Sequence, residues 1–361
     1  MPERTRLLLY GAYGYTGRLT AALAAAKQLD IVLSGRREEP LRELGKRLRL
    51  PIRAIGLDDA DALADALDDV ACVVHMAGPF ALTSEPMLSA CLATGAHYID
   101  VTGEIEVFEA IWSREDEIDR AGITAIPGAG FDVVPSDCLA AYVASNLAQP
   151  HWLTIAIRAA ASASQGTMRT AIRQIGKPAL CRRGGAIVVL DDQTPRRVNF
   201  GDGLEPCAPA SWGDVATAYH STGIENITTY LRQSRLLGLA SGGGRLLGGL
   251  LKSRIGQRAL AAVVRRLPEG PSASEREKHR STIWAGVSND AGASFEALLM
   301  TPDPYDLTAE SALEIATRVI ASAPLGLRTP SQAFGEDFVL SLSGCRRVAA
   351  RTSSDGAVIN S

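Results

Sequence analysis

Three glycines near the start of the chain have the spacing of a phosphate-binding turn. Gly11, Gly14 and Gly17 lie between a short apolar run and an Ala-rich stretch. Gly11 permits a tight turn, Gly14 lets the backbone approach a pyrophosphate, and Gly17 lets the next helix pack on the strand. An ordinary turn also tolerates such glycines, but the strand–turn–helix context favours a dinucleotide site. The expected contacts from this turn are Gly11, Tyr13, Gly14, Tyr15, Thr16 and Gly17.

Two arginines follow the next apolar run, where the choice between NAD and NADP is usually made. An NAD site commonly has an acid about 20 residues beyond the glycines, to bind the ribose 2′-hydroxyl. Here the run ends in Ser34, Gly35, Arg36 and Arg37, without an acid. A guanidinium suits both stacking on adenine and pairing with a 2′-phosphate. The alternative is a loop with two solvated arginines; we predict NADP(H), bound in part by Ser34, Arg36 and Arg37.

Polar, Gly-containing loops follow three later apolar runs, at residues 75–80, 100–104 and 128–137. In a doubly wound sheet, ligands bind beyond the carboxyl ends of the strands. We therefore place the turn at Ala77, Gly78 and Pro79 near the nicotinamide. The acids Glu104 and Asp137 in the other two loops either serve the site or cap helices.

Hydride transfer also needs a proton source. The first candidates are Tyr219 and His220, followed by Tyr98 and Asp132. Residues 217–221 read as a strand, which would point Tyr219 and His220 to opposite faces, so that one of them reaches a cleft. For each, a buried structural position is the alternative. The five histidines are scattered and no CxxC pair occurs, so we expect no metal site.

The elements that must position these residues fall into two groups. Before residue 150, apolar runs alternate with helical patterns, which predicts βαβ units and a parallel sheet. After it, strand-like runs follow one another with few helices, which indicates a mostly antiparallel sheet. The early runs are 6–10, 31–34, 52–55, 71–75, 98–101 and 123–126, and the later ones are 152–159, 186–190, 197–200, 217–221, 227–232, 282–287 and 295–300. A helix is expected through residue 320 with Thr308 as its N-cap, and polar residues from 351 are expected to fray.

Composition sets further bounds on the function. The chain has 361 residues, a formal charge of −3 and six cysteines without paired spacing. No basic excess calls for nucleic acid, and the cysteine pattern fits a reducing compartment. No secretory signal is apparent. We expect a soluble, cytoplasmic protein.

An apolar, Gly-rich segment runs from Leu236 to Leu251 and contains Arg245. It is too short, with its charge, to span a bilayer comfortably. It is a buried connector, a lid over a hydrophobic substrate, or a patch for peripheral contact with lipid or a carrier protein.

Taken together, the motifs resemble those of the saccharopine dehydrogenase-like oxidoreductases, in particular the bacterial branch that includes trans-acting enoyl reductases. The resemblance is carried by residues 10–18, 77–80, 97–104, 127–132, 212–214, 219–224 and 329–330. It implies an NADP(H)-dependent reductase with an N-terminal Rossmann domain and a mixed substrate domain. It also implies a C-terminal helix that packs back onto the Rossmann domain.

The expected fold class is α/β, a Rossmann-type doubly wound parallel sheet plus a second α+β domain with a mostly antiparallel sheet. The expected domains are 1–150 for NADP, 151–302 for substrate, 303–345 returning to the first domain, and a tail at 346–361. The expected function is NADPH-dependent reduction of an activated C=C bond in a hydrophobic acyl or polyketide-like small molecule, free or carrier-bound. Reduction of a C=N bond, saccharopine-type amine dehydrogenation and a non-catalytic nucleotide-binding scaffold are the alternatives. We expect a homodimer that does not bind nucleic acid.

Overall fold

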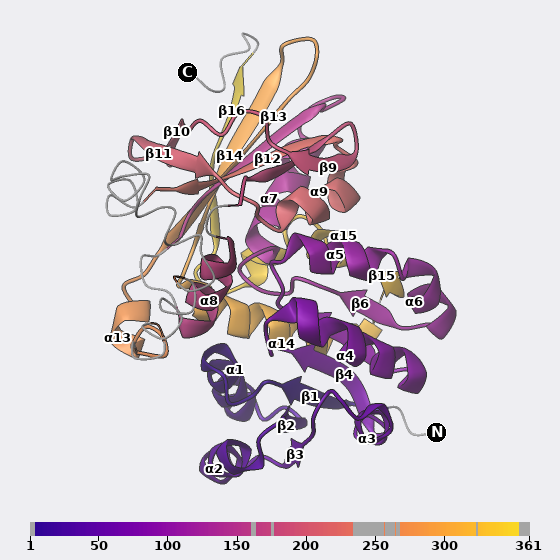
Figure 1. Cartoon of the computed structure of the whole chain (residues 1–361). Helices are drawn as coiled ribbons and strands as arrows, with labels where there is room; N and C mark the ends of the chain where they lie inside the picture. The colour runs from indigo at the N-terminus through magenta and orange to yellow at the C-terminus, as the bar shows by residue number, and fades with distance from the viewer. Residues whose placement is uncertain are drawn as a thin grey trace. The chain divides into compact units, whose positions relative to one another are not determined.

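The computed structural model describes residues 4–159, 164–174, 177–233, 256, 264, 268–322 and 324–353. The chain divides into two compact units (Figure 1). Unit 1 comprises Met1–Tyr142, Trp212–Gly223 and Pro304–Cys345, and unit 2 comprises Val143–Ser211, Ile224–Asp303 and Arg346–Ser361. This division differs from the expected boundaries. Residues 212–223, expected in the second domain, belong to unit 1, whereas residues 143–150 and 346–361, expected in the first domain and in a tail, belong to unit 2. Residues 304–345 do return to the first unit.

Unit 1 is built on a seven-stranded sheet in the order β15-β6-β5-β4-β1-β2-β3. Every neighbouring pair is parallel, which confirms the expected Rossmann-type sheet. The strands are β1 (Arg6–Tyr10), β2 (Ile31–Gly35), β3 (Ile52–Ala54), β4 (Val70–His75), β5 (His97–Asp100), β6 (Thr124–Ile126) and β15 (Gly326–Leu327).

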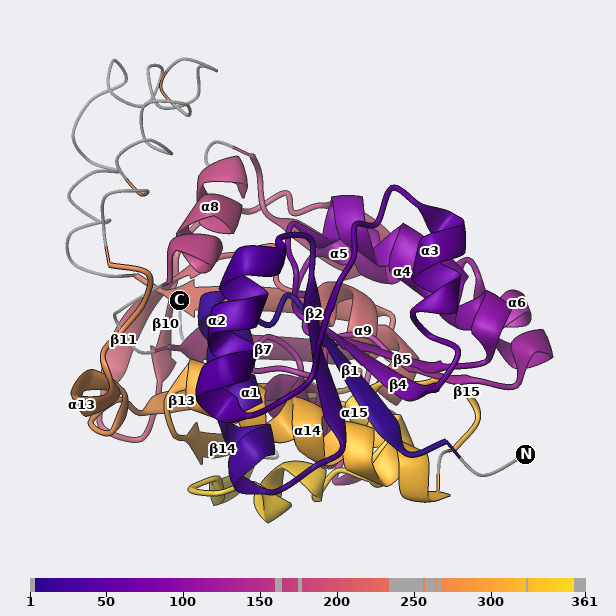
Figure 2. The same ribbon diagram turned by 90° about the horizontal axis from the view of Figure 1, so that it is seen from below.

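Helices cover both faces of this sheet, and α14 lies beside α1 (Figure 2). Because both faces are covered, β1, β2 and β4 are almost continuous apolar runs that are buried throughout most of their length. The helices are α1 (Tyr15–Ala26), α2 (Glu38–Leu48), α3 (Ala60–Asp65), α4 (Phe80–Thr94), α5 (Ile105–Trp112), α6 (Glu115–Ala121), α9 (Asp214–Thr222), α14 (Pro304–Ser322) and α15 (Pro330–Phe334), with a 3₁₀ turn at Phe338–Ser341. Helix α7 (Val134–Ser145) contains the point where the chain leaves unit 1.

Unit 2 contains a nine-stranded, mostly antiparallel sheet, as expected. Its main path is β10-β11-β12-β7-β13-β14-β16, and β8 joins β12 to β9. The pair β7–β12 is parallel and the other pairs are antiparallel. The strands are β7 (Trp152–Arg158), β8 (Leu180–Arg183), β9 (Ala186–Val189), β10 (Arg196–Asn199), β11 (Leu204–Pro209), β12 (Asn226–Arg232), β13 (Ser281–Ser288), β14 (Ser294–Thr301) and β16 (Arg346–Ser353), with helices α8 (Gln165–Gln174) and α13 (Ala273–Arg276).

Three local predictions are wrong. Residues 217–221 lie in helix α9, bounded by Gly213 and by the left-handed Gly223, and do not form a strand. Helix α14 begins at Pro304, so Thr308 lies inside it and is not its N-cap. The expected frayed tail begins too early, because residues up to Ser353 form β16 and pair with β14.

The segment from Leu236 to Leu251 lies outside the described residues, so its role stays an expectation. Within the described part of the chain, no helix is both long and apolar enough to cross a bilayer.

Candidate functional site

The turn after β1 is shaped by two glycines that admit no side chain. Gly11 has a φ of +85°, and a Cβ there would lie 2.9 Å from the amide nitrogen of Ala77 in the loop after β4. A Cβ on Gly17 would overlap the carbonyl oxygen of Gly11. The amide of Gly11 donates to the carbonyl of Ser34 over 2.9 Å, which ties the turn to β2. The close approach of α1 to β1 therefore requires both glycines.

The N-terminus of α1 is left open for an anion. Gly14 is the N-cap residue in extended backbone, no side chain caps the helix, and no acid lies in the first turn. A Cβ on Gly14 would meet only the carbonyl oxygen of Gly11, at 3.2 Å. Tyr15 and Thr16 form the first turn, and the Tyr15 ring packs edge-on against Tyr305 of α14 at 5.0 Å. Free N–H groups and the helix dipole suit a pyrophosphate here.

The carboxyl end of β2 presents an unpaired cation. Arg36 is exposed and makes no hydrogen bond or ion pair with the described residues. Beside it, the Arg37 guanidinium lies 4.9 Å from the centre of the Tyr13 ring, and that ring packs on Gly35. Arg36 is therefore available to a 2′-phosphate, whereas Arg37 and Tyr13 form the adjoining wall.

Ser34, expected to bind the cofactor, has a different role for its side chain. The side chain is buried, and the hydroxyl donates to the carbonyl of Arg53 over 2.7 Å. Its own carbonyl accepts from the amides of Gly11 and Ala12. Ser34 thus holds the glycine turn in place through its backbone.

His75, the last residue of β4, supports the following loop through a chain of hydrogen bonds. The Thr83 hydroxyl donates to the carbonyl of Ala77 over 2.6 Å, so it accepts the hydrogen bond from His75 Nε2 at 3.0 Å. Burial lowers the pKa of His75 to about 3, so the ring is neutral. This chain of bonds fixes the loop that contains Gly78 and Pro79, directly beside Gly11.

Tyr98 does not reach a substrate, which corrects its place among the proton donors. The side chain is fully buried, and its hydroxyl donates to Asp100 over 2.7 Å. Asp100 also accepts from the amides of Thr102 and Gly128, so it joins the loops after β5 and β6. Burial raises the pKa of Asp100 to about 6. Tyr98 and Asp100 therefore have a structural role, which is to hold the loops after β5 and β6 together.

Glu104 and Asp137 both cap helices, the simpler of the two alternatives. The Glu104 carboxylate accepts from the amides of Phe80 and Ala81, at 3.0 and 3.2 Å, at the start of α4. The Asp137 carboxylate accepts from the amide of Ser331 at the start of α15, over 2.7 Å. A carboxylate at a helix N-terminus satisfies free N–H groups and complements the dipole.

Asp132 is the acid that the loop after β6 leaves available. Its side chain is partly exposed and lies against Gly103, where a Cβ would come within 2.8 Å of Oδ2. Burial of the carboxyl raises its pKa to about 6 by desolvation. An acid of that pKa exists in both protonation states near neutral pH, as a proton donor requires. It lies at the carboxyl edge of the sheet, as the cofactor turn does.

Asp214, which sequence reasoning did not single out, lies at the start of α9. The preceding Gly213 packs against Phe108 and Val133, next to Asp132 in the chain. Neither Asp214 oxygen has a hydrogen-bond partner of normal geometry among the described residues. Burial raises the pKa of this carboxyl well above its usual range. The motif Trp212-Gly213-Asp214 was visible in the sequence, but nothing local indicated that the acid would be buried.

Tyr219 and His220 are not arranged as expected. Both lie on α9, so the strand alternation argued for them does not apply. The His220 ring stacks on Trp112 of α5, with centroids 4.0 Å apart and planes 14° apart. His220 is six residues from Asp214, or about 9 Å along the helix axis. The structure thus brings Asp132 to the edge where α9 begins, and leaves His220 well along that helix.

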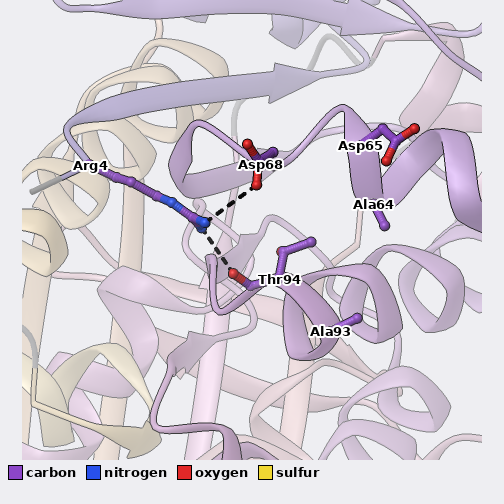
Figure 3. Close-up of a pocket in the computed structure, with 6 residues that line it drawn as sticks. All are labelled: Arg4, Ala64, Asp65, Asp68, Ala93 and Thr94. Atoms are coloured by element: carbon purple, nitrogen blue, oxygen red, sulfur yellow. Dashed lines mark hydrogen bonds and ion pairs between the residues drawn. The ribbon is translucent and has the colours of Figure 1, made fainter. Parts of the chain in front are cut away.

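A surface pocket lies at the opposite edge of the sheet, near the amino ends of β1, β4 and β5 (Figure 3). Its lining is Arg4, Ala64, Asp65, Asp68, Ala93 and Thr94. The Arg4 guanidinium bridges it, with a hydrogen bond of 2.9 Å to the Thr94 carbonyl and an ion pair with Asp68. Ligands of doubly wound sheets bind at the other edge, so we do not assign the cofactor here. The described residues include no cluster of three or more metal-binding side chains.

Comparison with known proteins agrees with this geometry. Residues 7–126 match the model of the saccharopine dehydrogenase NADP binding domain. This confirms the resemblance and the NADP cofactor for the N-terminal domain. The match spans β1 to β6 and includes the glycine turn, Arg36 and the loop after β4.

Curated relatives are similar over a part of their length. A saccharopine dehydrogenase-like oxidoreductase of Bos taurus is 26% identical over 161 residues, 39% of this chain and 38% of the relative. A trans-acting enoyl reductase of Mycobacterium leprae is 34% identical over 139 residues, 36% of this chain and 33% of the relative. A putative trans-acting enoyl reductase of Mycobacterium tuberculosis is 32% identical over 144 residues, covering 38% and 34%. The matches therefore span little more than a third of these relatives.

Solved structures share the fold of nearly the whole chain. Saccharopine dehydrogenase (L-Glu forming) of Saccharomyces cerevisiae has a TM-score of 0.66 at 13% identity, covering 97% of this chain and all of that one. A homospermidine synthase of Legionella pneumophila, solved with NAD, has a TM-score of 0.64 at 9% identity, covering 94% and 88%. At these identities the likeness shows a common fold.

Proposed function

We propose, from an N-terminal domain of the saccharopine dehydrogenase NADP-binding type, that this protein is an NADPH-dependent reductase of an activated C=C bond. The observation that carries the proposal is Asp132. It is a partly exposed acid with a pKa of about 6, on the sheet edge that also holds the glycine turn and the loop after β4. A reductase needs that combination of a cofactor cradle and a proton donor.

The residues present fit the cofactor. The open N-terminus of α1 would hold the pyrophosphate, and Arg36 would bind the 2′-phosphate. Tyr13 and Arg37 would contact the adenosine part of the cofactor. Ala77, Gly78 and Pro79 would border the nicotinamide, since their loop touches Gly11. When bound, NADPH supplies the hydride.

Asp132 would supply the proton. Hydride addition at the β-carbon of an enoyl group leaves the electron pair of the broken π bond on the α-carbon, conjugated with the carbonyl. Protonation of that carbon by Asp132 completes the reduction, and the Asp132 carboxylate regains its proton from water. The net reaction consumes one NADPH and one proton for each double bond.

The enoyl substrate is preferred over an imine because of the relatives. Over matched segments of 139–144 residues, the mycobacterial proteins named as trans-acting enoyl reductases are 32–34% identical to this chain. The mammalian saccharopine dehydrogenase-like oxidoreductases are 26–27% identical over 161–162 residues. We propose a hydrophobic acyl substrate, free or attached to a carrier.

The test is turnover by the purified chain. Loss of NADPH absorbance is followed with α,β-unsaturated acyl thioesters and, in parallel, with cyclic imines. We expect turnover of the thioesters that disappears in Asp132→Asn, with NADPH binding retained. Turnover of imines alone would replace the C=C assignment with C=N reduction. NADPH binding without turnover of either class would indicate a nucleotide-binding scaffold.

A further inference from the structure

The β8–β9 hairpin of unit 2 ends in an apolar strand with an unpaired edge. Among the described residues, β9 pairs with β8 and with no other strand. Val188 is 40% exposed and Val189 is 51% exposed, although neighbouring residues of a strand point to opposite faces. Both faces of β9 are therefore open, and its four residues, Ala-Ile-Val-Val, include no charge or proline to discourage pairing.

The hairpin turn determines which backbone groups face outward. Gly184 and Gly185 both have positive φ, as in a two-residue type I′ turn, so Arg183 and Ala186 form a hydrogen-bonded pair. Hydrogen-bonded and non-hydrogen-bonded pairs then alternate along the hairpin. The bond from the Leu190 amide to the Ala179 carbonyl, at 2.9 Å, agrees with this alternation.

It follows that Ile187 and Val189 present their N–H and C=O groups to the free edge. Two antiparallel copies of β9 satisfy all of these groups in one register, with Ile187 of each copy opposite Val189 of the other. Val188 then lies opposite its own counterpart at a two-fold axis, in a non-hydrogen-bonded pair.

We infer that β9 is a homodimer interface, at which two copies of the chain pair edge to edge around Val188. The pairing joins the two hairpins through main-chain hydrogen bonds and covers Val188 and Val189 of both chains. This inference does not depend on the proposed reaction.

The charges flanking β9 favour a second copy in the antiparallel direction. The exposed Asp191 and Asp192 follow the strand, and Arg183 precedes the turn. The Arg183 guanidinium also donates to the Thr228 hydroxyl and lies over the Trp152 ring, and its charge remains available to an acid of a second copy. In the register centred on Val188, Asp192 of one copy lies beside Gly184 of the other, next to Arg183. Parallel pairing would bring the acids of both copies together, which costs free energy.

Crosslinking at the two-fold axis tests the register. In a non-hydrogen-bonded antiparallel pair the Cβ atoms are about 4.5–5.5 Å apart, close to disulfide geometry. Cys181 lies opposite Val188 across the hairpin, so the variant is made in a Cys181→Ser background to prevent an intrachain disulfide. Full-length Val188→Cys in that background should form a covalent dimer on mild oxidation, seen on a non-reducing gel. The matched control is Leu204→Cys, at another exposed apolar position of unit 2, on β11. Absence of the crosslink in Val188→Cys, or an equal yield in Leu204→Cys and wild type, would overturn the inference.

A second test places a charge at the two-fold axis of the proposed dimer and measures the oligomeric state. Val188→Lys places two ammonium groups opposite each other, and we expect sedimentation equilibrium to show a monomer where wild type is a dimer. Leu204→Lys should remain a dimer, and the thermal midpoints should confirm that both variants are folded. A monomeric wild type would exclude a second copy as the occupant of this edge, and a dimeric Val188→Lys would place the interface elsewhere.

Discussion

The amide of Phe131 donates a hydrogen bond of 3.0 Å to the hydroxyl of Thr308, 177 positions further along the chain. In the same helix, the Ser311 hydroxyl donates to the carbonyl of Ala129 over 2.7 Å. Helix α14 thus holds the loop that presents Asp132. The segment that returns to unit 1 therefore supports the loop that contains Asp132, although it is far from that loop in the sequence.

Arg36→Ala should weaken NADPH binding and leave NADH binding nearly unchanged. Loss of one charge-assisted hydrogen bond costs about 1.5–3 kcal/mol, or roughly 10- to 150-fold in Kd. Isothermal titration calorimetry with both nucleotides measures the difference. Arg42→Ala, which removes an exposed arginine paired with Glu38, is the control and should bind NADPH normally. An equal loss for NADH and NADPH would contradict the assignment.

Gly14→Val and Gly17→Val should fail in different ways. At Gly14 the backbone is ordinary and the Cβ meets one atom at 3.2 Å, so the fold should survive while the side chain blocks the pyrophosphate. At Gly17 the Cβ would overlap the Gly11 carbonyl, and overpacking of this kind costs about 1–3 kcal/mol of stability. Thermal denaturation and calorimetry together separate the two. Undiminished NADPH binding by Gly14→Val would show that the turn is merely structural.

Asp132→Asn should lower kcat by about 10²–10⁴-fold with NADPH affinity unchanged. Because the protonated form donates and the pKa is about 6, wild-type kcat should fall as the pH rises above that value. The variant should lack this inflection. Tyr219→Phe and His220→Ala should retain turnover and the pH profile, because these residues lie along α9 and His220 stacks on Trp112. A large loss in either of them would restore the first assignment of the proton donor.

Asp214→Asn should stabilise the protein more at high pH than at low pH. A carboxyl whose folded pKa lies above the unfolded 3.8 costs no stability below 3.8, and costs more as the pH rises through that value. Asparagine removes the titration, so the gain in thermal midpoint should be larger at about pH 8 than at about pH 4. A pH-independent difference would mean that Asp214 is not held neutral by burial.

The cofactor side of the protein was predictable from sequence. The glycine turn, the arginines after β2 and the alternation of apolar runs are local signals, each confined to one strand–loop–helix unit. They predicted the parallel sheet, and the family match supports the NADP cofactor. The spacing of Gly11, Gly14 and Gly17 between an apolar run and an Ala-rich stretch was sufficient to identify the turn, although Gly11 also contacts the distant Ala77 and Ser34.

The roles of the acidic residues depended on contacts between residues that are distant in the sequence. Whether Asp137 or Glu104 caps a helix depends on α15 and α4, and the availability of Asp132 depends on α14 and on Gly103. The segment containing Tyr219 reads as a strand by composition, yet packing of its small apolar face beside α5 makes it a helix of unit 1. Local pattern determined which residues could bind the nucleotide. Burial and hydrogen bonding across the fold decided which acid has a raised pKa and is available as a proton donor. The reason is that desolvation is a property of the surroundings and not of the residue.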